Sequence, residues 1–157
     1  RAAARLTITA QDFFEQLEKN TSKDIVAFTN HLIQDCQEMG LVMEWNVSSL
    51  GVKLPEPKGS GTRISIFTID KYGFIYLGYS KGQFQKLNIP NELIYRFAAD
   101  TAALIPGVQQ HPENKYVWDK YALVNNIQSV YPQFMVMVKE YIDNIQKTME
   151  SKGVSEF

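Results

Sequence analysis

The chain has 157 residues, of which 45% are apolar and 12% aromatic, and its net charge is −1. These values predict one globular domain with a sizeable core and exclude an intrinsically disordered chain. The single cysteine, Cys36, excludes an internal disulfide framework and any metal site built on several cysteines. We expect no cofactor and no metal, and a lone thiol favours a reducing cytoplasm as the compartment.

The start of the chain and its apolar runs indicate how the chain is divided. The chain begins RAAAR and contains no apolar run long enough for a membrane span or a signal peptide, so we expect no membrane contact. Residues 1–6 are predicted to be a linker or the tail of an upstream region, and residues 7–157 to form a single α+β domain. A fragment of a longer protein and a stand-alone protein with a trimmed start both agree with this beginning.

Two helices are predicted before any strand. Thr9 is placed to cap a helix over residues 10–19, and Ser22 is placed to cap the next helix. Gly40 stands where a left-handed glycine ends a helix. Apolar side chains recur between these caps at helical spacing, which predicts a buried stripe of Ile25, Phe28, Leu32, Cys36 and Met39.

The middle of the chain changes to a period of two residues, which predicts strands over residues 41–47, 51–54, 63–70 and 74–80. Pro55 and Pro57 end the pairing of the second strand, and the glycine-rich segment that follows is expected to be a mobile surface loop. Gly73 permits a tight hairpin turn between the last two strands. The four segments therefore predict an antiparallel meander.

Two more helices are expected after the sheet. Pro90 opens one that runs to Leu104, and Pro132 opens the last, which runs to about Glu150. Residues 108–124 are expected to be irregular, with a short strand at 121–124. Because the strands cluster instead of alternating with helices, the fold class is α+β: an antiparallel four-stranded meander flanked by two N-terminal and two C-terminal helices, not a parallel nucleotide-binding sheet.

The charge is unevenly distributed along the chain. Residues 53–86 carry six basic and two acidic side chains, a net charge of +4, and aromatic residues lie between them. In an ordinary sheet, lysines protect edge strands from aggregation and aromatic rings are common strand residues. In a nucleic-acid-binding surface, lysines bind phosphates and the rings stack on unpaired bases. Trp118 is read either as a plug over the core or as the rim of a groove. The predicted ligand-binding residues are Arg63, Lys71, Tyr72, Tyr76, Lys81 and Trp118.

Motifs of catalysis are weak in this sequence. Glu56-Pro57-Lys58 matches half of a nuclease metal motif, but a proline splits it in a loop. Segment 58–63 is glycine-rich, yet it leads into a strand and lacks the spacing of a phosphate-binding loop. His31 is expected to pair with Asp35 at the surface of a helix. No acid pair or nucleophile–base pair stands out, so catalysis by this domain alone is not expected.

The segment NIPNELIYRFAADTAALIPGV over residues 88–108, the Glu44-Trp45 strand and the helix-opening Pro132 resemble an uncharacterised bacterial α+β domain. The resemblance covers most of residues 7–150. Such domains are accessory modules beside nucleases and defence proteins, which implies a role in recognition or assembly and possession of an upstream catalytic domain. The resemblance assigns a role to no residue.

Two functions remain open from the sequence. The first is a non-catalytic recognition or accessory domain that binds nucleic acid through one outward patch on the basic, aromatic sheet and hairpin. The alternative is a protein-interaction or dimerisation domain of a larger bacterial protein, in which the chain forms a homo-oligomer or packs on another domain.

Overall fold

The computed structural model describes residues 6–56, 58–78, 80–120 and 122–155, and it has the predicted α+β class. Helices α1 (Ala10–Asn20) and α2 (Lys23–Glu38) come first. Thr9 and Ser22 cap them as predicted, because each hydroxyl accepts a backbone N–H three residues ahead. Of the linker expected at residues 1–6, residues 1–5 lie outside the described residues.

The sheet is an antiparallel meander of five strands in the order β1-β2-β3-β4-β5. The fifth strand is the short one expected near residues 121–124. A bulge at Val52/Lys53 shifts the pairing of β2 with β3. The strands are β1 (Val42–Trp45), β2 (Ser49–Pro55), β3 (Arg63–Asp70), β4 (Phe74–Tyr76) and β5 (Ala122–Leu123).

The two faces of the sheet differ in polarity. Apolar side chains paired across β2 and β3 are all buried: Leu50 with Ile69, Val52 with Phe67, and Leu54 with Ile64. Alternation places polar or half-exposed side chains on the opposite face. Among these are Lys53, Arg63, Thr68 and Tyr76.

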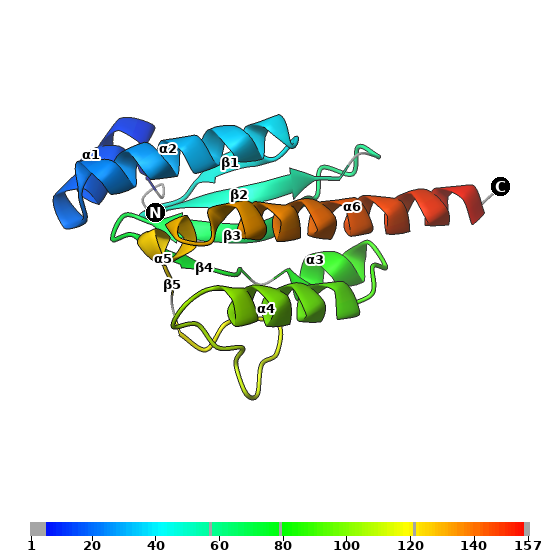
Figure 1. Cartoon of the computed structure of the whole chain (residues 1–157). Helices are drawn as coiled ribbons and strands as arrows, with labels where there is room; N and C mark the ends of the chain where they lie inside the picture. Colours follow the sequence, from blue (N-terminus) through cyan, green and yellow to red (C-terminus); the bar gives the residue numbers. More distant parts are fainter. Residues whose placement is uncertain (1–5, 57, 79, 121, 156–157) are drawn as a thin grey trace, which may run out of the picture.

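Helices cover the apolar face. The ring of Phe13 on α1 contacts Trp45, and Phe134 contacts Phe67, with ring centroids 5.3 and 5.9 Å apart. Phe134 belongs to α6 (Tyr131–Ser155), the longest helix, which runs along the sheet beside β2 and β3 (Figure 1). The core therefore lies between the sheet and the layer formed by α1, α2 and α6.

The chain between β4 and α6 holds more helix than the sequence predicts. It forms α3 (Lys81–Lys86), α4 (Glu92–Leu104) and α5 (Val124–Gln128), so four helices follow β4 instead of two. Helix α4 packs against α6 (Figure 1). The stacked rings of Phe97 and Tyr141, 4.2 Å apart, lie in this contact.

The fourth strand is shorter than predicted. It ends at Tyr76 instead of continuing to residue 80, and the position of Tyr79 lies outside the described residues. The reason is a side chain: Gln83 of α3 accepts the backbone N–H of Ser65 at 2.8 Å. At Ser65 a glutamine amide oxygen thus stands where a carbonyl of a continuing β4 would accept, and the chain turns into α3.

The glycine-rich segment after β2 is a turn organised by one carboxylate. Glu56 is buried and accepts the backbone N–H groups of Lys58 and Ser60 at 2.7 and 3.0 Å. Burial acts to raise the pKa of Glu56, but these hydrogen bonds and the nearby Lys58 charge outweigh it and leave the pKa lowered. The N–H groups that would hold a phosphate in this loop already bind the protein's own carboxylate.

Candidate functional site

The six predicted ligand-binding residues do not form one patch. Arg63 begins β3 and lies 3.4 Å from the Glu44 carboxylate. Lys71 and Tyr72 form the turn at the other end of this strand, with the Lys71 ammonium 5.4 Å from the Tyr72 ring centroid. A strand rises about 3.3 Å per residue, so the eight residues of β3 separate these groups by roughly 25 Å.

The other three residues lie around His111. One surface hollow of about 510 Å³ is lined by His111 and Lys81, and a second of about 310 Å³ is lined by His111, Tyr76 and Trp118. We call this region the His111 site. Its lining also includes Leu77, Ser80, Glu113, Asn114, Tyr116, Val117, Asp119 and Lys120.

The loop that carries His111 is a small hairpin-like structure. Gln110 and Trp118 form an isolated antiparallel bridge, and the His111 N–H donates to the Val117 carbonyl at 3.0 Å. The Gln110 side chain closes the loop from within by donating to the Lys115 carbonyl at 2.7 Å. Residues 109–119 therefore have a defined shape despite their irregular sequence.

Trp118 attaches this loop to the protein. Its ring is 7% exposed, and its Nε1–H donates to the Thr101 hydroxyl of α4 at 3.0 Å. Thr101 in turn donates to the Phe97 carbonyl at 2.6 Å. A ring buried in this way presents no open face to a base, so Trp118 supports the His111 site from below.

The His111 imidazole is held by a turn that Pro112 begins. Its Nδ1 accepts the backbone N–H groups of Glu113 and Asn114, at 3.1 and 2.9 Å. A neutral imidazole whose Nδ1 is an acceptor carries its proton on Nε2. The side chain can therefore donate through Nε2 while the turn occupies its other nitrogen.

Beside His111, two tyrosines and two lysines form a cluster. The rings of Tyr95 and Tyr116 meet edge to face, with centroids 6.2 Å apart. The Lys81 ammonium lies 5.2 Å from the centroid of the Tyr116 ring, and the Lys115 ammonium lies 5.6 Å from the centroid of the Tyr95 ring. Three of these residues, Tyr95, Lys115 and Tyr116, were missed by the sequence-based prediction because they come from α4 and the loop, apart from the basic segment.

The charges around the site are mixed, with a small positive excess. Lys81, Lys115 and Lys120 supply three cations, and Glu113 and Asp119 supply two carboxylates. All five side chains are exposed, so salt screens their interactions strongly. Lys81 and Lys115, which lie over the tyrosine rings, are the cations placed to attract an anionic ligand to the cluster.

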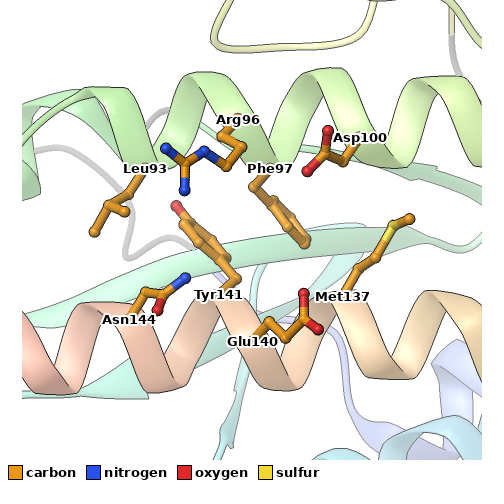
Figure 2. Close-up of a pocket in the computed structure, with 8 residues that line it drawn as sticks. All are labelled: Leu93, Arg96, Phe97, Asp100, Met137, Glu140, Tyr141 and Asn144. Atoms are coloured by element: carbon orange, nitrogen blue, oxygen red, sulfur yellow. The ribbon is translucent and has the colours of Figure 1, made fainter.

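The seam between α4 and α6 is a different kind of hollow (Figure 2). Phe97 and Tyr141 stack at its floor, while Arg96 and Glu140 stand at its rim. Burial raises the pKa of the Tyr141 hydroxyl, partly offset by a hydrogen bond with Ser80. Only about 40 Å³ of free space remains, enough for a few water molecules, so the seam is a packed contact.

The side chains with catalytic potential outside the His111 site include Cys36, His31 and Asp35 on α2. Over the described part of the chain, no group of three or more His, Cys, Asp or Glu side chains is placed to hold a metal ion. Burial raises the pKa of Cys36 to about 12, and the neighbouring Asp35 adds to this rise, so the thiol stays protonated. His31 lies 3.2 Å from Asp35, the predicted pair, and Tyr131 donates its hydroxyl to the same carboxylate.

None of the helices in the described ranges is long and apolar enough to cross a membrane. No protein-family model, no curated protein and no solved structure matches this chain.

Proposed function

We propose that this domain is a non-catalytic recognition module that binds a single strand of nucleic acid at the His111 site. The observation that carries the proposal is the pair of contacting tyrosines, each with a lysine over its ring, beside a hollow of about 510 Å³. We place the surface at the His111 site and not on the sheet and hairpin expected from the sequence, because Arg63 and Lys71 lie at opposite ends of β3.

The chemistry favours an unpaired strand over a duplex. Bases stack on tyrosine faces only when they are unstacked from one another, and each such contact contributes about 1–3 kcal/mol. Lysine side chains are long and flexible. A base that displaces Lys81 from the Tyr116 ring leaves the ammonium close by, where it can pair with the phosphate of the same nucleotide.

The test is the binding of a fluorescein-labelled 12-mer of deoxythymidylate, followed by fluorescence anisotropy in increasing salt. Three lysines at the site predict a slope of log Kd against log salt of about 2, because each single-strand phosphate contact contributes about 0.7. Glu113 stands beside the same hollow, so the Glu113→Gln variant is expected to bind more tightly. Weak binding that is insensitive to salt contradicts phosphate contact.

A matched control is present in the chain itself. Lys71 and Tyr72 form the same kind of cation–ring pair, at 5.4 Å, but in the turn between β3 and β4. We expect Lys81→Ala with Tyr116→Ala to weaken binding at least tenfold, and Lys71→Ala with Tyr72→Ala to change it less than twofold. Equal losses in the two double variants place binding outside the His111 site.

A second candidate function is protein interaction. An open hollow of about 400 Å³ lies between the end of α2 and the start of α6, lined by the apolar residues Met39, Pro132, Met135 and Val136 and by the charged residues Lys139 and Glu140. Val136 is 56% exposed. If a second copy of the chain covers this face, light scattering shows a mass that rises with concentration and falls back in the Val136→Glu variant. The same apolar face could instead pack on an upstream catalytic domain, and this contact belongs to the protein-interaction proposal.

A further inference from the structure

We infer that His111 is a ligand-contact residue, which binds a phosphate oxygen of the bound strand by donating a hydrogen bond from Nε2 as a neutral imidazole. This inference rests on the proposed function and adds the chemical role of one side chain to it. It differs from attraction by lysine, because a neutral donor adds direction to the contact without adding charge.

The backbone of the turn sets the tautomer of His111. Both backbone N–H groups of the turn, from Glu113 and Asn114, point to Nδ1 of His111 at 3.1 and 2.9 Å. An atom that accepts two N–H groups cannot also carry a hydrogen, so a neutral ring has its proton on Nε2. The backbone of the loop, and not the ligand, therefore decides which nitrogen donates.

The His111 side chain is placed beside both hollows and close to a cation. His111 lines both hollows of the site, and its ring is only half-buried. Lys81 lines the larger hollow with it. A charged acceptor satisfies a donor and a cation at the same time, which makes a phosphate oxygen a better partner than a neutral base carbonyl.

The loop that carries His111 is held in place by contacts to α4. The loop is tied by the bridge between Gln110 and Trp118, and Trp118 is tied to Thr101 on α4. A donor held on a fixed loop does not lose conformational freedom when it binds, so its hydrogen bond contributes more to affinity than that of a mobile side chain.

The experiment separates this role from that of a turn-forming residue. In the His111→Asn variant, the asparagine Oδ1 can accept the same two N–H groups, as is usual before proline, but the side chain lacks a donor at the Nε2 position. The His111→Ala variant loses both functions. The probe is the labelled 12-mer of deoxythymidylate, and thermal denaturation is measured on each variant.

We expect His111→Asn to retain the melting temperature of the parent and to bind more weakly by about tenfold or more, which is the effect of one lost hydrogen bond to a charged group. The slope of log Kd against log salt stays unchanged in this variant. In Lys81→Gln, by contrast, the slope falls by about 0.7. Long-range proton–nitrogen NMR spectra of the imidazole are expected to show the Nε2–H tautomer.

Three results overturn the inference and leave the proposed function standing. These are parental affinity in His111→Asn, a salt slope that falls in this variant, and an imidazole with its proton on Nδ1. If the parent protein does not bind the oligonucleotide at all, the proposed function fails first, and the role of His111 fails with it.

Discussion

The hydrogen bond between Trp118 and Thr101 provides the sharpest test of how the His111 site is built. The Trp118 Nε1–H is buried, and its acceptor is the Thr101 hydroxyl at 3.0 Å. Valine has the shape of threonine but lacks the hydroxyl. Thr101→Val therefore keeps the packing of α4 and leaves a buried indole N–H without an acceptor.

The expected cost is about 2 kcal/mol of unfolding free energy, within the range of about 1–3 kcal/mol for an unsatisfied buried donor. In a domain of this size, such a loss lowers Tm by roughly 4–8 °C. In the Trp118→Phe background the donor is already absent, so adding Thr101→Val is expected to change stability by less than about 0.5 kcal/mol. The coupling between the two positions is then about 1.5–2 kcal/mol.

The assay is urea denaturation of the parent, both single variants and the double variant, followed by circular dichroism. Because Trp118 holds the loop of His111, Thr101→Val is also expected to weaken oligonucleotide binding below the temperature at which the domain unfolds. If Thr101→Val costs the same in both backgrounds, the hydrogen bond does not carry the stability that we assign to it, and the loop has another attachment.

Three further experiments test the turns and the core. Gly73→Ala is expected to destabilise the protein by more than Gly40→Ala in chemical denaturation. Both glycines have positive φ, at +88° and +92°, but a Cβ at Gly73 lies 2.7 Å from Thr21 Cγ2, whereas none of the described atoms lies within 4 Å at Gly40. Glu56 has a lowered pKa, so its stabilisation is present above its unfolded value of about 4.5 and is lost as pH falls through the folded value. Glu56→Gln is therefore expected to flatten the fall in Tm on acidification, and an unchanged acid profile contradicts this reasoning. Cys36 is buried, with a pKa raised to about 12, so a thiol reagent at pH 8 is expected to react only on unfolding; rapid reaction of the native protein contradicts the packing of α2.

Local patterns accounted for much of the fold. Residues 63–70 were predicted as a strand and form β3, because the segment is rich in β-branched side chains that pack in a sheet. The stripe that includes Leu32 and Cys36 lies in the core, and Gly40 has φ +92° after α2. Each of these features depends on residues within one element and its immediate flanks.

Short helices and the end of β4 were not predictable in the same way. Helix α3 spans six residues with one buried ring, Phe84, so it contains too few turns for a periodic signal. The strand prediction over residues 74–80 was wrong beyond Tyr76 because the Gln83 side chain occupies the hydrogen-bonding position beside Ser65. That competition involves residues 18 positions apart.

The sequence by itself determined an α+β domain, the antiparallel meander and the helices that bury its apolar face, because these follow from periodicity, caps and turns within short stretches of chain. Only the tertiary structure decided where the candidate site lies. Tyr95 and Tyr116 meet because α4 and the following loop pack together, and Lys81 joins them because Gln83 draws α3 to the edge of β3. Contacts between distant elements depend on how their surfaces fit together, and the residue pattern within one element does not predict that fit.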